Sequence, residues 1–251
     1  MNASFWSAER TAAFLLFSPS HLAAIVILVS LAVLLYFGRS AIRANRSRQT
    51  AVRGLLLVML LVPEALLYGW YALERTWDVK STLPLELCSI TLMLSAIMLV
   101  TRSRLLYQLL FFAGIGGALQ AMLTPSLGYP FPHFRFLHFF IVHGAIILSA
   151  LYMTWVEGCK PTWRSVGFAM IFLNVLAGIV WIINQKLGSN YMFLMHKPAT
   201  ASILDALGPY PYYLLAEEAI AAALFALMYA VFFLKPFRKQ DHMPPPSNLH
   251  G

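Results

Sequence analysis

Long apolar runs separated by short polar connections dominate this sequence. Seven runs are long enough, or nearly so, to cross about 30 Å of hydrocarbon at about 1.5 Å per residue. They span residues 22–37, 54–72, 83–100, 105–123, 136–155, 166–184 and 212–234. Only helices or closed barrels satisfy the backbone in lipid, and these runs lack the strict alternation of a barrel. The pattern therefore predicts an all-α membrane bundle of about seven transmembrane helices.

The composition agrees with a membrane protein. Hydrophobic residues make up 60% of the chain and charged residues 11%, whereas soluble domains carry about a quarter charged residues. The net charge of +8 does not predict nucleic-acid binding, because the basic residues lie between apolar runs as topology signals do. We expect one bundle domain over residues 1–238 and a disordered, proline-rich tail at 239–251.

Lysine and arginine are distributed unevenly between alternate connections. One side carries twice as many as the other: Arg39, Arg43, Arg46, Arg48, Arg53, Arg102, Arg104, Lys160, Arg164, Lys235, Arg238 and Lys239 against Arg10, Arg75, Lys80, Arg135, Lys186 and Lys197. By the positive-inside rule we expect a multi-pass protein of the cell membrane, with its N-terminus outside and its C-terminus inside. Cys88 and Cys159 then lie on opposite sides and form no disulfide.

Ionisable residues within the runs gather toward the predicted outer ends, and the inner halves of the runs have none. They are Glu64, Glu86, Cys88, His138, His143, Glu217 and Glu218. Charged groups in hydrocarbon cost several kcal/mol and normally face a cavity or a partner. Because four helices place such groups in one layer, we expect a polar pocket that opens outward.

Cys88 and His143 are the candidate catalytic residues of this pocket. Cys88 lies near a helix N-terminus, where the dipole favours a thiolate nucleophile, and a deep histidine needs a partner. Each also has a structural interpretation, since a buried cysteine is commonly inert. Glu64, Glu86 and Glu218 are candidates for orienting a base or lining the pocket. Glu64 follows Pro63 and could instead serve freed backbone groups, while Glu86 could offset a helix end.

The segment at 124–143 adds candidates for headgroup binding. His133 and Arg135 stand at the predicted outer interface, and Lys197 lies in the long connection at 185–211. An arginine fork suits a phosphate or carboxylate, although interfacial anchoring is the alternative. The connection is either a lid or packing on top of the bundle. Histidines spaced by five do not share a helical face, so we expect no metal site and no cofactor; a zinc hydrolase is a weak alternative.

Four stretches resemble one known family. They are LPLELC (83–88), TPSLGYPFPHFRFLHFFIVHG (124–144), NYMFLMHKP (190–198) and LGPYPYYLL (207–215). This pattern resembles YwaF-type bacterial integral membrane proteins, which are related to the eukaryotic transmembrane protein 164 family, associated with lysophospholipid acyl transfer. The resemblance implies Cys88 as nucleophile and His143 as base. Family members often have His where Glu86 stands.

The resulting hypothesis is a lipid-modifying enzyme at the outer leaflet. Cys88 would attack an ester of a phospholipid or lysophospholipid and form a thioester, which an acceptor hydroxyl or water would resolve. The rival is a transporter or small-ligand binding protein using the same cavity through Glu64 and Glu218. No inverted repeat and no polar group in the inner half support transport. The sequence leaves the oligomeric state open.

Overall fold

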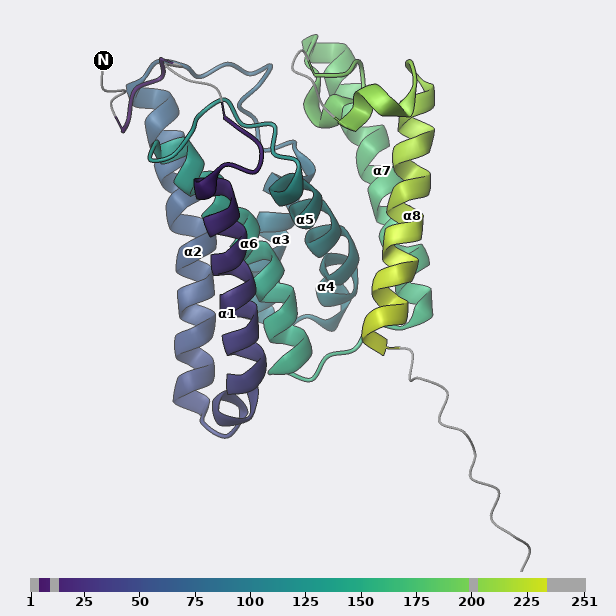
Figure 1. The fold of residues 1–251 in the computed structure, drawn as a ribbon. Coiled ribbons are helices and arrows are strands. Elements are labelled where there is room, and N and C mark those ends of the chain that lie inside the picture. The colour runs from purple at the N-terminus through teal and green to yellow at the C-terminus, as the bar shows by residue number, and fades with distance from the viewer. Residues whose placement is uncertain (1–4, 10–13, 199–202, 234–251) are drawn as a thin grey trace, which may run out of the picture.

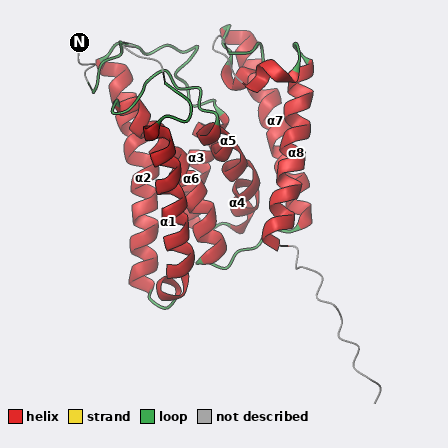
Figure 2. Ribbon diagram, in the orientation of Figure 1, coloured by secondary structure: helices red, strands yellow, loops and turns green. Residues whose placement is uncertain are grey.

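The computed structural model describes residues 5–9, 14–198 and 203–233. The tail predicted at 239–251 lies outside the described residues. The described chain is an all-α bundle (Figures 1 and 2), as the apolar runs predict. Its elements in order are α1 (Pro19–Arg43), α2 (Arg46–Leu73), α3 (Leu87–Thr101), α4 (Arg104–Leu109), the π-helical η1 (Leu110–Gly114), α5 (Ile115–Leu123), α6 (Phe134–Trp155), α7 (Trp163–Leu187), the short 3₁₀ helices η2 (Tyr191–Phe193) and η3 (Ile203–Leu207), and α8 (Tyr212–Phe233).

All seven predicted helices are present in the described chain. Six are long and apolar enough to cross a membrane, the fourth being the continuous α4–η1–α5 stretch, Arg104–Leu123. The remaining helix, α3, is apolar but has only 15 residues, or about 22 Å of length. Its predicted first residues, 83–86, are not helical. The third span therefore begins below the level at which its neighbours begin.

The start of α2 differs from the sequence prediction. The side chain of Asn45 accepts hydrogen bonds from the backbone N–H groups of Ser47 and Arg48, which satisfies two unpaired donors of a helix start. The helix consequently begins at Arg46, eight residues before the predicted residue 54. The predicted start was the first residue of the apolar run, whereas the capping residue determines where the helix begins. Arg53, predicted to lie in a connection, is a helical residue.

Helix α6 is the centre of the bundle. It packs against α1, α2, α3 and α5, and every residue from Val142 to Met153 is buried. By contrast, α1, α7 and α8 expose large apolar side chains, the surface expected to face lipid. Figure 1 shows α7 and α8 side by side at one flank of the bundle, where they contact the α4–η1–α5 stretch.

Two glycines of α5 permit close packing with neighbouring helices. A Cβ atom at Gly116 would lie 3.0 Å from the ring of Phe225 on α8, and one at Gly117 would lie 3.1 Å from Leu87 on α3. Small residues at helix contacts let membrane helices approach closely. Gly117 thus helps to place the first turn of α3, which carries Cys88.

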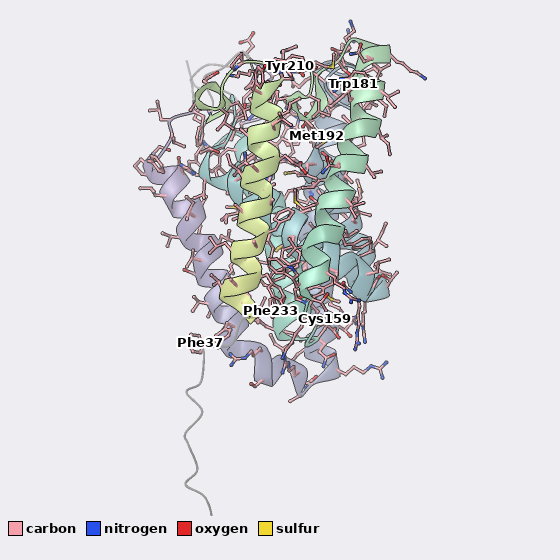
Figure 3. All side chains as sticks on the ribbon, turned by 90° about the vertical axis from the view of Figure 1, so that its right-hand side faces the viewer. Phe37, Cys159, Trp181, Met192, Tyr210 and Phe233 are labelled. Carbon is pink, nitrogen blue, oxygen red and sulfur yellow. The ribbon has the colours of Figure 1, made fainter. Side chains whose placement is uncertain are left out.

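The two ends of the bundle differ in chemistry. Figure 3 looks onto α7 and α8, with Met192 and Tyr210 toward one end and Cys159 and Phe233 toward the other. Cys88, in the first turn of α3, and Cys159, which follows α6, lie toward opposite ends; both are free. The end at Cys159 also receives the connection between α1 and α2 and is called the basic end below.

Candidate functional site

A carboxylate–imidazole pair lies inside the bundle between α2 and α6. Glu64 Oε2 is 3.1 Å from His138 Nε2, and their side chains are 8% and 11% exposed. A carboxylate accepts, so the ionised form of Glu64 takes the hydrogen of Nε2, leaving Nδ1 of a neutral ring with the lone pair. The sequence offered Glu64 as a possible partner of His143; in the structure its hydrogen bond goes to His138.

His143 is held deeper on α6, and its own partner sets its tautomer. Its Nδ1 lies 2.7 Å from the backbone carbonyl oxygen of Phe139. Because a carbonyl oxygen only accepts, Nδ1 carries the hydrogen and Nε2 of the neutral ring has the free lone pair. His143 also interacts electrostatically with His138 and Glu64. The three side chains therefore form one buried group, called the Glu64 cluster here.

Cys88 lies in the first turn of α3 without a described hydrogen bond to His143. The N-cap of this helix is Glu86, whose side chain makes no capping hydrogen bond. The first backbone N–H groups of a helix lack partners within it, and in α3 the side chain of the N-cap does not satisfy them. Cys88 is thus placed beside an electropositive helix end. The direct thiol–imidazole contact predicted from sequence is absent from the described hydrogen bonds.

Cys88 and the Glu64 cluster are linked by longer-range electrostatic interactions at the predicted outer end of the bundle. Cys88 interacts with Glu86, and Glu86 with Tyr191. Tyr191 in turn interacts with Tyr68, which interacts with Glu64. These residues come from α2, α3 and η2, and the histidines from α6. The layer of polar groups expected from the sequence therefore also includes Tyr191 of η2. The apolar pattern gave no indication that this loop helix belongs to the layer.

Tyr191 connects this layer to the loop that follows α7. It is 2% exposed, its hydroxyl donates to the carbonyl of Val79 (2.7 Å) and accepts from the N–H of Leu83 (2.9 Å). Burial raises the pKa of Tyr191, and the carboxylates of Glu86 and Asp78 raise it further. The hydroxyl thus remains a donor at neutral pH. It fixes the extended residues that lead into α3.

The loop itself is ordered by side chains of α7 and α3. Asn184 accepts from the N–H of Tyr191 and donates to its carbonyl, both at 2.9 Å. The carboxylate of Glu86 accepts from the N–H of Met192 at 3.0 Å. Met192 and Phe193 have positive φ angles of 56° and 52°, a region that costs energy for residues other than glycine. Glu86, a candidate pocket residue, thus holds a strained turn against the start of α3.

Arg135 lies next to the Glu64 cluster on α6. Its Nη1 donates to the hydroxyl of Tyr71 at 3.2 Å, and its guanidinium lies 5.6 Å from the ring centroid of Trp70. Its Nε is buried and has no hydrogen-bond partner among the described residues. Arg135 also interacts electrostatically with His138. A guanidinium with unused donors beside the buried pair suits an anionic ligand.

The N-terminal residues 5–9 lie over the ends of α2 and α6. Five hydrogen bonds attach them, joining Phe5 to Phe134, Trp6 to Trp70, Ser7 to His133, and Ala8 to both Glu74 and Tyr129. Trp70 and Phe134 are buried in the small apolar cluster beneath this segment. The segment therefore covers the region directly above Arg135.

The remaining candidates lie elsewhere or are already engaged. His133 caps α6, where its Nδ1 accepts from the N–H of Arg135 while Nε2 lies 2.8 Å from the carbonyl of Ser7. Lys197 Nζ lies 5.7 Å from the ring centroid of Tyr213. Glu218 accepts a hydrogen bond from Asn174 of α7, which is not part of the Glu64 cluster. Of the predicted headgroup ligands, Arg135 is nearest to the buried pair.

An apolar groove of about 400 Å³ lies on another face of α6. Its lining includes Ala24 and Leu31 of α1, Met59 of α2, and Leu137 and Ile141 of α6. On α6 the lining residues recur at three- and four-residue spacing, which defines one helical face. Neither histidine of the Glu64 cluster belongs to that face. The groove is therefore separate from the polar layer.

Comparison with known proteins places the chain in a family. The model of the TMEM164 family matches residues 16–229, which include every candidate site residue. The chain belongs to the TMEM164 family. It is also similar to an uncharacterized protein of Treponema pallidum (strain Nichols), with 26% identity over 239 residues, covering 92% of this chain and 93% of that protein. No solved structure matches the chain.

The motifs that resemble this family contain features that sequence reasoning passed over. His138, which the sequence gave no catalytic role, is the partner of Glu64. Tyr191, which no sequence pattern singled out, joins three segments. Both residues lie in the quoted TMEM164-like stretches, and that shared location was the one available signal. Tyr71, which binds Arg135, lies outside those stretches.

Proposed function

We propose that this TMEM164-family protein is a multi-pass lipid-modifying enzyme of the cell membrane, acting by acyl transfer or hydrolysis on phospholipids or lysophospholipids. The observation that carries the proposal is the buried Glu64–His138 pair with Arg135 and His143 beside it. Intramembrane ionisable groups are costly and mark functional sites. A carboxylate that orients an imidazole is the arrangement of a general base.

Arg135 is the proposed ligand of the substrate phosphate. Its unpartnered Nε and its position under residues 5–9 place a cation next to the imidazoles, at one end of the bundle. A phospholipid held there by its headgroup presents its ester bonds to the layer below, where the acyl chains begin. Lys197 is a second candidate from the neighbouring loop.

Cys88 is the proposed nucleophile. Its thiolate attacks the ester carbonyl carbon, the ester C–O bond breaks, and the lysolipid leaves as an alcohol after taking a proton from the imidazolium. The acyl group remains as a thioester on Cys88 until an acceptor hydroxyl or water attacks it. The uncapped N–H groups at the start of α3 suit the oxyanion formed in both steps. His143, with its free Nε2, is the proposed base.

The test follows acyl transfer by mass spectrometry, using the full-length protein in vesicles that contain a phospholipid donor and an isotopically labelled lysophospholipid. Cys88→Ala should lower turnover at least 100-fold and abolish a hydroxylamine-sensitive acyl group on the protein. The matched control is Cys159→Ala, which removes the thiol at the basic end and should leave turnover within about twofold.

His143→Ala and His138→Ala separate the two imidazoles. The proposal expects the larger loss from His143→Ala, about 100-fold or more, as for a general base; a larger loss from His138→Ala transfers that role to the Glu64-oriented ring. If the wild-type protein in vesicles neither acylates Cys88 nor changes the lysophospholipid, it is not this enzyme. The alternative function, a small-ligand binding protein or transporter, then accounts for the Glu64 cluster.

A further inference from the structure

The basic end of the bundle collects arginines from four helices. Arg43 ends α1, Arg53 lies in the third turn of α2, Arg102 follows α3 and Arg104 begins α4. Within the described residues, Glu157 is the one carboxylate at this end. Topology signals require only positive charge on one side of the membrane. The arrangement of these side chains is more specific than that requirement.

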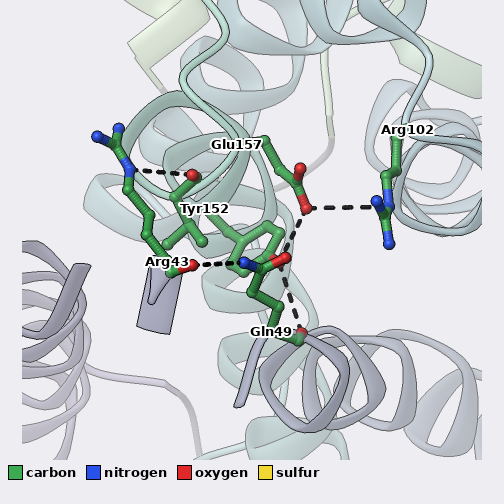
Figure 4. A network of polar contacts seen from close by, with 6 residues as sticks. Arg43, Gln49, Arg102, Tyr152 and Glu157 are labelled. Carbon is green, nitrogen blue, oxygen red and sulfur yellow. Dashed lines mark hydrogen bonds and ion pairs between the residues drawn. The ribbon is translucent and has the colours of Figure 1, made fainter. Parts of the chain in front are cut away.

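Glu157 and Tyr152 form the centre of the arrangement (Figure 4). The hydroxyl of Tyr152 donates to Glu157 Oε1 at 3.0 Å, and Arg102 Nε lies 4.0 Å from the same oxygen. Arg102 adopts a left-handed conformation with φ 53°. The carboxylate thus meets an arginine and a tyrosine.

Arg43 approaches the same turn from α1. Its Nε donates to the carbonyl of Val156 at 3.0 Å, while Gln49 donates to the carbonyl of Arg43 at 2.9 Å (Figure 4). These contacts fix the inner nitrogen of the guanidinium. None of the described hydrogen bonds uses its two terminal nitrogens. The outer edge of the arginine fork is therefore available to a ligand.

Arg53 is the most informative member of the group. Its Nε is buried and has no hydrogen-bond partner among the described residues. Arg53 and Arg102 both interact electrostatically with Tyr152, so two cations lie around the Tyr152–Glu157 contact. Buried polar groups without partners are rare in folded proteins. An anion beside these two cations would offset their excess positive charge.

We propose that Arg53 and Arg102 bind the phosphate of an anionic phospholipid headgroup at the basic end of the bundle. Arginine forks bind phosphate oxygens in pairs, and basic pockets between transmembrane helices hold anionic lipid headgroups. The side chain of Arg102 is 43% exposed, which leaves the cluster accessible at the level where the helices end. A lipid is favoured over a soluble phosphate because this level is the membrane interface.

This binding site is separate from the proposed catalytic site. Arg53 and Glu64 are eleven residues apart on α2, or about 16 Å along the helix axis. The predicted orientation puts the basic end inside and the Glu64 cluster toward the outside. The bound lipid therefore belongs to the opposite leaflet and is not the substrate.

The experiment measures lipid retention on the full-length protein by native mass spectrometry after exchange into detergent with equal phosphatidylglycerol and phosphatidylcholine. Wild type should retain phosphatidylglycerol in preference to phosphatidylcholine. Arg53→Gln should weaken that retention about tenfold, as expected for loss of a charged hydrogen-bond donor. Arg46→Gln is the matched control, since it removes the same charge from an exposed position of the same helix, and it should change retention less than twofold.

A second variant should change phosphatidylglycerol retention in the opposite direction. An increase in retention cannot result from misfolding. Glu157→Gln keeps an acceptor for Tyr152 but removes the competing carboxylate, so it should increase phosphatidylglycerol retention severalfold. The proposal is overturned if Arg53→Gln and Arg46→Gln act equally, or if Glu157→Gln reduces retention. It is also overturned if inorganic phosphate stabilises the protein against heat and phosphatidylglycerol does not, because the ligand is then a soluble phosphate.

Discussion

At the scale of single residues, Glu64 and His138 depend on each other. Replacing either by alanine leaves the other buried without its partner, so each variant should lower the free energy of unfolding by about 1–3 kcal/mol. The double variant should lose less than the sum, with a coupling energy of about 0.5–3 kcal/mol. Denaturant titration of the protein in mild detergent measures all three values.

A distant pair provides the control for this cycle. Glu64→Ala and Cys159→Ala lie toward opposite ends of the bundle and share no described contact, so their effects should add within about 0.5 kcal/mol. Additivity of Glu64→Ala with His138→Ala as well would mean that the 3.1 Å contact contributes nothing to stability, contrary to the expectation.

The same pair shows what sequence can say about a residue. Depth along an apolar run placed Glu64 and His143 in one layer and His138 nearer the surface, because about 1.5 Å per residue converts position into depth. Depth does not give the rotation of α6 about its axis. His138 and His143 are five residues apart and point in different directions, so only packing decides which one meets Glu64. The hydrogen bond of Glu64 goes to His138, whereas the sequence offered Glu64 or Glu218 as the group that orients His143.

At the scale of helices, Gly116 controls the approach of α5 to α8. A methyl group there would lie 3.0 Å from the buried ring of Phe225, so Gly116→Ala should destabilise the bundle by about 1–3 kcal/mol through overpacking. Gly54→Ala, where nothing lies within 4 Å of the added atom, should be neutral or slightly stabilising. Thermal unfolding of both variants in detergent compares them.

A compensating change distinguishes overpacking from a change in helix propensity. Phe225→Leu should restore stability to Gly116→Ala, because it removes the ring that the new methyl group meets. It should destabilise the wild-type protein, where it leaves a cavity. If Phe225→Leu lowers the stability of Gly116→Ala as much as that of wild type, then α5 and α8 do not pack as described.

The number of helices could be predicted from the sequence, but the starts of α2 and α3 could not. Apolar runs report burial in hydrocarbon, and all seven runs correspond to helices. The capping residue determines where a helix begins. Asn45 caps α2 within the stretch that was predicted to connect the first two helices. The π-helical turn η1 left no signal, since its five residues are all buried and apolar or glycine. Residues 83–86 are not helical, and Leu83 and Glu86 bind Tyr191 and Met192 of the distant loop after α7.

At the scale of the whole molecule, contacts between distant segments assemble the candidate site. Residues 5–9 bind α2 and α6, and the loop after α7 binds the start of α3. Neither segment belongs to an apolar run, so periodicity could not place them. The motifs that resemble the family include residues of these contacts, such as His133 and Glu86, for which hydropathy gives no signal.

Orientation in the membrane is the remaining prediction, and both proposed lipid sites depend on it. Single cysteines at Ser47, at the basic end, and at Lys80, in the connection before α3, are both at exposed positions. In a Cys88→Ser, Cys159→Ser background, a membrane-impermeant thiol reagent should label Lys80→Cys in intact cells and Ser47→Cys only after permeabilisation. The unequal distribution of arginine and lysine predicts this labelling pattern, because arginine-rich connections remain on the inner side of the membrane.

The opposite labelling pattern would reverse the leaflet of each proposed ligand without changing the chemistry of either site. The Glu64 cluster would then act on inner-leaflet lipids, and Arg53 would face outward, away from the negative surface potential of the cytoplasmic leaflet that favours anionic headgroups at basic clusters. The expected pattern instead puts the four arginines where anionic lipids concentrate. Orientation therefore decides whether Arg53 and Arg102 meet an abundant ligand or a scarce one.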